Sequence, residues 1–283
     1  GVLKVLGELR IPLDYIAGTS MGSVVGGLYA CGLSPEEIDA NLRAIDWYEI
    51  FEDRPPRRHL PLRRKQVDQA ALFDIELGVG PRGLEFPTGL VAGQKLDYLL
   101  EALTLRSAGA ADFDELPIPF RAVATDIDTG ERVILWRGGP AEAMRASMAV
   151  PGAFTPVQRD HMTLVDGGLV CNLPVDLVRS MGADVVIAVD ISPQADAFRE
   201  GESTAKIVVQ SLYLLMDQNA QEQRELLGPG DVLITPDLGD MSPADFQRVA
   251  SAIDVGEAGA RDGVEELSRL SVSEGEYREV LER

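Results

Sequence analysis

The sequence predicts an α/β protein in which helices cover both faces of a mostly parallel central sheet. Short apolar runs that suit buried strands alternate along the chain with longer stretches of helical periodicity. The 283 residues, of which 45 % are hydrophobic and 25 % charged, are enough to bury a substantial core. We therefore expect one domain over residues 1–283, with a core over about 1–200 and a helical part over about 201–283.

Six apolar runs are expected to form the strands of this sheet: 13–17, 120–127, 132–136, 163–165, 184–189 and 231–235. The second and third are joined by Asp128-Thr129-Gly130, a typical turn sequence, so we expect them to pair. The run 184–189 is apolar throughout, which indicates a fully buried strand. The stretch 46–89 is irregular, and only residues 72–77 alternate there like a strand. Such a long irregular stretch is more often functional than idle.

Helical periodicity is expected over 1–9, 21–30, 34–44, 94–105, 141–148, 174–181, 205–227 and from 242 to the end, with a break near 256–263. The third helix has a clear start, because Ser34 can cap it and Pro35 suits its first turn. The long helix 205–227 is amphipathic, and its apolar residues Leu212, Leu215 and Met216 could pack on the sheet or form a dimer contact.

The formal net charge of −20 argues against a nucleic-acid partner and against general adsorption to an anionic membrane. One basic segment interrupts this acidity, with His59 among its cations: Arg54, Arg57, Arg58, Arg63, Arg64 and Lys65. It is either a solvated loop or a patch in which Arg57, Arg58, Arg63 and Arg64 contact phosphate head groups. No apolar run is long enough to span a bilayer.

Few residues could hold a metal ion. The chain has two histidines, and its two cysteines, Cys31 and Cys171, are far apart in the sequence. A zinc site is therefore not expected, and neither is a cofactor. One disulfide between the two cysteines stays open.

Ser20 is the candidate nucleophile. Gly18-Thr19-Ser20-Met21-Gly22 fits the pattern G-x-S-x-G, which places a serine at a sharp turn from a strand into a helix. An apolar strand precedes it and a helix of small residues follows. Glycines at positions 18 and 22 avoid side chains that would clash at the corner. The N–H groups of Met21 and the following turn could stabilise a negatively charged oxygen.

Asp166 is the candidate base. It ends a short expected strand and precedes Gly167 and Gly168, which allow close approach of another element and leave the carboxylate accessible. Partial burial would raise its pKa and make it a better proton acceptor. A second interpretation is an α/β-hydrolase triad of Ser20, an acid such as Asp126 or Asp128, and His161. A third is a lipid-binding or assembly module without catalysis.

Several motifs in order resemble those of the patatin-like phospholipase family, most closely its bacterial branch, some members of which carry a C-terminal outer-membrane barrel. They are DYIAGTSMG at 14–22, ATD at 124–126 with Thr129-Gly130, RAS at 145–147, VPGAF at 150–154 with Pro156-Val157, DGG at 166–168 and NLP at 172–174. The resemblance spans residues 1 to about 190. It implies a three-layer α/β fold.

The same resemblance implies a serine–aspartate dyad, with Ser20 as nucleophile and Asp166 as base, that hydrolyses phospholipids or other lipid esters at a membrane surface. A homodimer is compatible with it. It suggests a secreted, periplasmic or outer-membrane-associated protein, with a cytoplasmic location left open. Family members carry a strand and a Gly-rich oxyanion loop before the helix that matches 1–9, and this sequence begins inside that helix. We therefore expect a fragment or processed product of weak activity.

Overall fold

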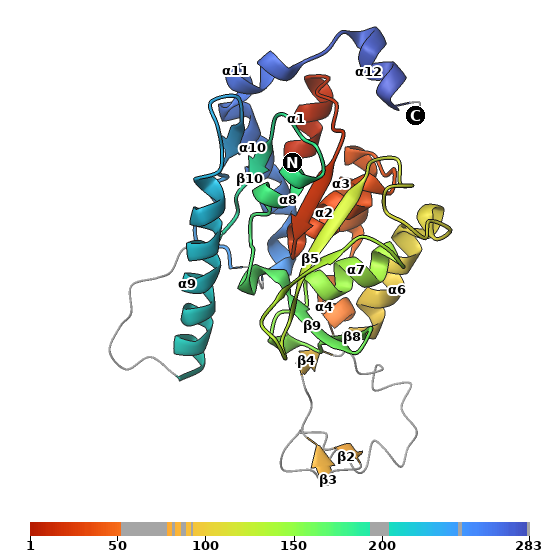
Figure 1. Cartoon of the computed structure of the whole chain (residues 1–283), viewed down its shortest axis with the longest axis vertical. Coiled ribbons are helices and arrows are strands. Elements are labelled where there is room, and N and C mark those ends of the chain that lie inside the picture. Colours follow the sequence, from red (N-terminus) through yellow and green to blue (C-terminus); the bar gives the residue numbers. More distant parts are fainter. Residues whose placement is uncertain are drawn as a thin grey trace.

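The computed structural model describes residues 1–51, 78–80, 83–85, 89–91, 93–192, 204–242 and 245–281. Its centre is a five-stranded sheet with helices on both faces, which confirms the expected α/β class (Figure 1). The strands of this sheet are β1 (Ile16–Thr19), β5 (Phe120–Asp126), β6 (Arg132–Leu135), β8 (Val157–Arg159) and β9 (Met162–Asp166). β5 is its longest strand and pairs with three of the others.

Two strands share one edge of β5. These strands are β1 and β9. β6 pairs antiparallel with Ala122–Thr125, a stretch that overlaps the partners of both, so β6 occupies the opposite edge. β1 therefore runs beside the first half of β5, where Thr19 lies opposite Val123. β9 runs beside the second half, where Asp166 lies opposite Ala124. The chain that leaves β1 and the end of β9 thus meet at neighbouring positions along β5.

The sheet is mixed, whereas a mostly parallel one was expected. Among the pairings of the five-stranded sheet only β1–β5 is parallel. β5–β6 and β8–β9 are hairpins, and short connections force antiparallel pairing. Parallel pairing recurs in two smaller sheets, β10 (Ile187–Val189) with β11 (Val232–Ile234) and β4 (Gly89–Val91) with β7 (Gly152–Phe154). A further antiparallel pair joins β2 (Gly78–Gly80) and β3 (Gly83–Glu85).

The prediction of a fully buried strand at 184–189 is wrong. Ala188 is buried, but Val185 and Val189 are exposed. β10 pairs with β11 in its own two-stranded sheet, so its apolar side chains are only partly covered. Position within a sheet is a tertiary property, and an apolar run alone does not fix it.

Alternate residues of β5 point into two different layers. Phe120, Ala122 and Ala124 join the core cluster that includes side chains of α2 (Met21–Ala30) and α7 (Pro140–Ser147). Val123 packs in the opposite direction, with Leu177 of α8 (Val175–Ser180) and Cys171. This alternation produces three layers, with the sheet in the middle.

The helix boundaries follow the local signals in the sequence. At the N-terminus, α1 spans Val2–Glu8 and α3 spans Pro35–Ala44. The hydroxyl of Ser34 accepts a hydrogen bond from the Glu37 N–H, and the Glu37 carboxylate accepts one from the Ser34 N–H, which completes a capping box. Further helices in the described ranges are α4 (Trp47–Phe51), α6 (Gln94–Leu103), η2 (Leu105–Ser107), α9 (Thr204–Arg224), η4 (Phe246–Arg248), α10 (Val249–Asp262), α11 (Val264–Leu267), η5 (Ser268–Leu270) and α12 (Glu274–Leu281).

The helical break expected near 256–263 occurs at Gly263 alone. Gly256 and Gly259 lie inside α10, and close packing explains only Gly259, since a Cβ on Gly256 would come no nearer than 3.7 Å, to the Cα of Gly1. A Cβ on Gly259 would lie 3.1 Å from the Cα of Pro236, and one on Gly1 would lie 2.1 Å from the carbonyl oxygen of Ile253. Here small residues serve contact between elements, not the end of a helix.

Three further predictions concern a strand, a disulfide and membrane-spanning segments. The strand expected at 72–77 lies outside the described residues. Both cysteines are buried free thiols, so no disulfide joins Cys31 to Cys171. No helix in the described ranges combines the length and the apolar character that crossing a bilayer demands.

Candidate active site

Ser20 occupies a strained corner between β1 and α2. Its backbone φ of 52° and ψ of −125° are unusual for a residue with a side chain. The strand ends at Thr19 and the helix begins at Met21, so the whole change of direction falls on this one residue. Strain of this kind persists only where the surroundings hold it, and it presents the Ser20 hydroxyl at the end of the strand.

The two glycines of the motif differ in their surroundings. A Cβ on buried Gly18 would lie 2.5 Å from the carbonyl oxygen of Gly22, so the close approach of strand and helix requires a glycine there. A Cβ on Gly22 would meet nothing within 4 Å. The expectation that Gly22 avoids a clash is therefore wrong, because its own Cα faces open space.

Asp166 lies at the end of β9 and is completely buried. Its Oδ2 accepts a hydrogen bond of 2.6 Å from the Ser20 hydroxyl, and its Oδ1 accepts one of 2.7 Å from the Gly168 N–H. Burial raises the pKa of the Asp166 carboxyl to about 6, and the two hydrogen bonds oppose that rise. The structure thus brings together the two candidate residues, 146 positions apart in the sequence.

The backbone around Asp166 is held on both sides. Its N–H donates to the carbonyl oxygen of Ala149 at 2.9 Å, and its carbonyl oxygen accepts from the Thr125 hydroxyl at 2.9 Å. Asp166 also caps the short helix η3 (Gly167–Leu169). These contacts fix the direction of the carboxylate before any substrate arrives.

The two glycines after Asp166 differ in what a side chain would meet: backbone at Gly167, and the flexible end of Met216 at Gly168. A Cβ on Gly167 would lie 2.2 Å from the carbonyl oxygen of Val123, which is backbone of the central strand. A Cβ on Gly168 would lie 2.4 Å from the terminal methyl of Met216 and 3.0 Å from the Asp166 carboxylate. Gly167 therefore permits contact with β5, and Gly168 permits contact with α9.

Ser147 supports the corner, a role that the sequence did not reveal. This completely buried residue ends α7, and its hydroxyl accepts a hydrogen bond of 3.0 Å from the Ser20 N–H. The same hydroxyl donates to the carbonyl oxygen of Val123 at 2.5 Å. It thereby joins the strained residue to the central strand. The only signal for it was its place in the RAS motif at 145–147, which assigns no contact.

Asn219 of α9 supports the loop after Asp166, and sequence reasoning missed it too. Its side-chain amide donates to the carbonyl oxygen of Gly168 at 2.8 Å and accepts from the Asn172 N–H at 2.7 Å. Asn219 lies 51 residues from Gly168, and a polar residue on a long helix carries no sign of such a partner.

The start of α2 provides hydrogen-bond donors near the Ser20 hydroxyl. The N–H groups of Ser23 and Val24 both donate to the Ser20 carbonyl oxygen. The first N–H groups of a helix have no acceptor within it, and the described part of the chain supplies none for Met21 or Gly22. These two donors and the positive end of α2 favour negative charge at this corner.

His161 does not reach Ser20. It lies exposed at the tip of the hairpin between β8 and β9 with a φ of 68°, five residues from Asp166 along an extended strand. At about 3.3 Å per residue, this separation is on the order of 16 Å. Asp126 accepts hydrogen bonds from Thr129 and Asp128 in the adjoining turn. The described structure therefore does not assemble the alternative triad.

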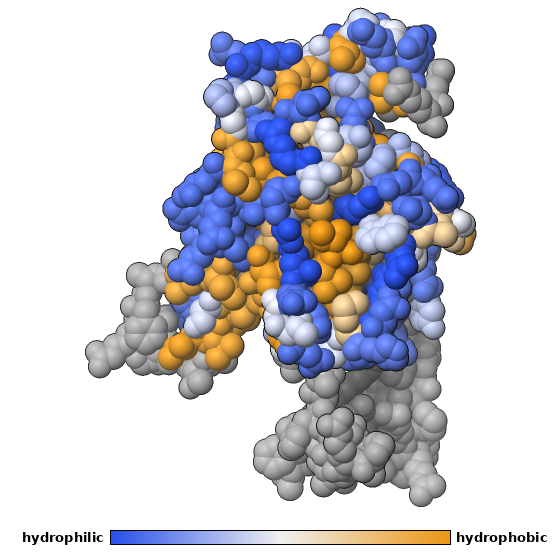
Figure 2. Space-filling model, viewed as in Figure 1, coloured by the Kyte–Doolittle hydropathy of each residue, from blue (hydrophilic) through white to orange (hydrophobic). Residues whose placement is uncertain are grey.

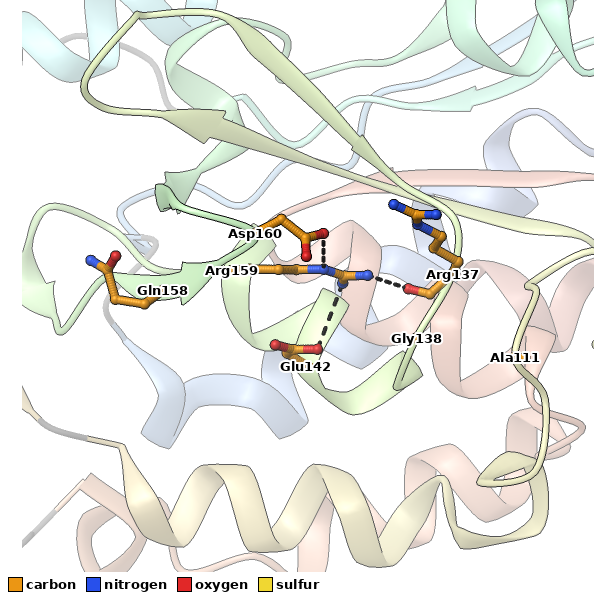
Figure 3. Close-up of a pocket in the computed structure, with 7 residues that line it drawn as sticks. All are labelled: Ala111, Arg137, Gly138, Glu142, Gln158, Arg159 and Asp160. Atoms are coloured by element: carbon orange, nitrogen blue, oxygen red, sulfur yellow. Dashed lines mark hydrogen bonds and ion pairs between the residues drawn. The ribbon is translucent and has the colours of Figure 1, made fainter.

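An open pocket lies beside this hairpin and is lined in part by Gln158, Arg159 and Asp160 (Figure 3). Arg159 lies at its centre and donates to the carbonyl oxygen of Arg137 at 2.6 Å. The Arg159 guanidinium is also 3.7 Å from the Glu142 carboxylate and 3.8 Å from that of Asp160. The pocket lining has two cations and two anions and includes neither Ser20 nor Asp166. We therefore do not assign this pocket to the candidate active site.

The expected head-group contacts lie outside the described residues. These are Arg57, Arg58, Arg63 and Arg64, and His59 lies in the same stretch.

Comparison with known proteins gives a consistent result. The profile of the family described as patatin-like phospholipase matches residues 1–179. A patatin-like phospholipase domain-containing protein of Caenorhabditis elegans is 33 % identical over 198 residues, which are 68 % of this chain and 12 % of that protein. An uncharacterised NTE family protein of Mycobacterium bovis is 31 % identical over 204 residues, 71 % of this chain and 48 % of that protein. Patatin-like phospholipase domain-containing protein 7 of Rattus norvegicus is 30 % identical over 194 residues, 68 % of this chain and 12 % of that protein.

The matched part of this chain thus spans less than half the length of these relatives. They come from animals and bacteria, so they do not assign the chain to one branch. The family profile covers the Ser20 corner and the Asp166 loop together. This chain belongs to the patatin-like phospholipase family.

Proposed function

We propose that this protein hydrolyses carboxylic esters of lipids, with Ser20 as nucleophile and Asp166 as its base. The observation that carries the proposal is the 2.6 Å hydrogen bond from the Ser20 hydroxyl to the buried Asp166 carboxylate. A serine hydroxyl needs an adjacent acceptor to become a nucleophile, and this carboxylate is within reach. The family supports lipid hydrolysis, because its members are described as patatin-like phospholipases.

The proposed reaction begins when the Ser20 oxygen attacks the ester carbonyl carbon and its proton moves to Asp166. The N–H groups of Met21 and Gly22 are the donors nearest the corner for the oxyanion that forms. Collapse of this intermediate breaks the ester bond, and Asp166 returns the proton to the leaving alcohol. The fatty acyl group is then bound to Ser20.

Water completes the cycle. Asp166 takes a proton from the water that attacks the acyl-enzyme, and Ser20 regains its proton when the fatty acid leaves. A pKa raised to about 6 suits both roles, since the carboxylate is ionised at neutral pH yet more basic than an exposed aspartate. The side chains that take part in the proposed steps are those of Ser20 and Asp166.

The proposed partner is a lipid layer that presents the ester, and nucleic acid is not among the proposed partners. A net charge of −20 would repel phosphate backbones and strongly anionic membranes. A lipid surface with little net charge therefore suits this protein better.

Hydrolysis of phosphatidylcholine and of a soluble short-chain ester tests the proposal, with three variants compared with the wild type. We expect Ser20→Ala and Asp166→Asn each to lower the rate by at least about a thousandfold. His161→Ala is the control and should retain the wild-type rate, because His161 lies at the hairpin tip. A large loss in His161→Ala, or near-normal hydrolysis by Ser20→Ala, would rule out the proposed dyad.

A further inference from the structure

The first half of α9 carries aliphatic side chains that the described part of the protein leaves exposed. Five of them have exposed fractions from 43 % to 55 %: Ile207, Val208, Val209, Leu214 and Leu215. Hydrophobic residues gather over this half of α9, at the lower left of the space-filling view (Figure 2). Scattered apolar residues are normal on a surface, but a contiguous group such as this marks a contact site.

The arrangement on the helix explains why packing does not cover the group. Successive residues of a helix are about 100° apart, so Ile207, Val208 and Val209 point in three directions around the axis. Further along α9, the body of the protein buries Met216 and Ala220. Val209 lies two turns before Met216 on the same face and is nevertheless exposed, so its exposure follows from its place nearer the start of the helix. A contact that covered all five aliphatic residues would have to surround this end of the helix.

The same half of α9 lacks acidic residues. From Thr204 to Met216 the sequence contains one charged residue, Lys206, and the first acid is Asp217. The whole chain has 46 acidic and 26 basic residues, and this interval of 13 residues contains none of the acids. Contact of this segment with an apolar layer would remove no carboxylate from water.

This segment adjoins the candidate active site. Met216 follows it directly, and the Met216 methyl lies against Gly168. One helical turn further, Asn219 holds the Gly168 carbonyl oxygen in the loop after Asp166. A surface that contacted the exposed half of α9 would thus lie close to the Asp166 loop.

We propose that residues 207–215 of α9 dock the protein on a lipid surface of little net charge. The inference rests on the proposed lipid-ester hydrolysis, because a substrate within a lipid layer must reach Ser20 from that layer. A specific protein interface would draw on tryptophan, tyrosine and arginine anchors. The exposed hydrophobic residues here are isoleucine, valine and leucine, which suit a fluid acyl layer.

Binding to vesicles of pure phosphatidylcholine tests the docking surface. The protein carries Ser20→Ala in this assay, so that lipid is not consumed, and the fraction that sediments with the vesicles is measured. Val208 and Leu215 lie two turns apart on one side of α9. We expect Val208→Glu with Leu215→Glu to lower the partition coefficient at least about tenfold. Both positions are exposed and glutamate is a good helix former, so α9 should persist.

Leu105→Glu is the matched control, because Leu105 is equally apolar and more exposed but follows α6 on the other side of the molecule (Figure 1). It should bind vesicles like the parent protein. Equal losses in both variants would overturn the proposal, as would a parent protein that does not bind. Light scattering in lipid-free buffer adds one more test. If the parent protein is a dimer that does not bind vesicles, and the α9 variant is a monomer, this surface is the contact with a second copy of the chain.

Vesicles that contain anionic lipid distinguish docking through α9 from docking through the basic segment 54–65. Phosphatidylglycerol added to the vesicles should weaken binding, because the chain is strongly acidic. Stronger binding that persists in the α9 variant would overturn the proposal and transfer docking to the arginines. Hydrolysis of a soluble short-chain ester, with Ser20 intact, should stay within about twofold of wild type in the α9 variant. If the wild-type protein does not hydrolyse the ester, the proposed function is refuted. The vesicle-binding measurement does not depend on that result.

Discussion

Glycine is needed at only one of the two positions that flank the Ser20 corner. A Cβ on Gly18 would collide with the backbone of Gly22, whereas one on Gly22 would enter open space. We expect Gly18→Ala to lower the free energy of unfolding by about 3 kcal/mol, since backbone atoms must move. Gly22→Ala should be neutral or stabilising by up to about 1 kcal/mol, because alanine favours a helix. Urea unfolding of both variants checks this contrast, and equal losses would contradict it.

Ser147 holds the corner through two buried hydrogen bonds, one to the Ser20 N–H and one to the Val123 carbonyl oxygen. Ser147→Ala leaves these groups without their partner, which should cost about 1–3 kcal/mol of stability. Because Ser20 is then held less firmly, we also expect kcat for a soluble ester to fall at least about tenfold.

Ser107→Ala is the control for this prediction. Its buried hydroxyl donates to the carbonyl oxygen of Cys31 at 3.2 Å, on another part of the molecule. It should lose stability but retain kcat. Retained kcat in Ser147→Ala would show that Ser147 is merely structural.

The positions and contacts of single residues were predictable from sequence where the signal is local. Ser20 lies within a five-residue motif that encodes its own turn, and the two glycines beside Asp166 indicated a close approach. Ser147 and Asn219 act across 127 and 51 residues, and an isolated serine or asparagine has no local pattern. The steric reason given for Gly22 failed because open space is a property of the assembled fold.

At the scale of elements, α9 connects to the Asp166 loop through Asn219. Removal of its amide in Asn219→Ala would release the Gly168 carbonyl oxygen and the Asn172 N–H. We expect kcat to fall about tenfold with little change in KM, because the carboxylate loses its fixed direction.

Gln223 lies one turn further along α9 and provides the matched control. Its side-chain oxygen accepts from the Asp176 N–H at 2.9 Å, at the start of α8 and away from the loop. Gln223→Ala should lower stability without lowering kcat. Equal losses of kcat in the two variants would mean that α9 acts only through general stability.

Helices were predicted more accurately than strands. α2 matches its expected range, and α3 begins at its capping box, since caps and periodicity are encoded within a few residues. β1 begins three residues later than expected, at Ile16. The direction of β9 and the exposure of Val189 depend on neighbouring strands that are distant in sequence.

At the scale of the whole molecule, the proximity of Ser20 and Asp166 follows from strand register. β1 and β9 share one edge of β5, and Thr19 and Asp166 lie opposite the adjacent residues Val123 and Ala124. The fold thereby places the end of β1 next to the end of β9. The class of fold and the contact between Ser20 and Asp166 were predictable, but this shared edge was not, because no motif reports which strands pair.

The rate of Ser20 modification by a fluorophosphonate, followed across pH by intact mass and peptide mapping, tests the central claim most directly. If buried Asp166 is the base, one adduct forms at Ser20. Its rate is nearly constant above about pH 7 and falls tenfold per pH unit below about pH 6, where the carboxylate takes up a proton. Asp166→Asn should lose the reaction. Labelling of Asp166→Asn at the wild-type rate, or an adduct at another residue, would contradict the assignment.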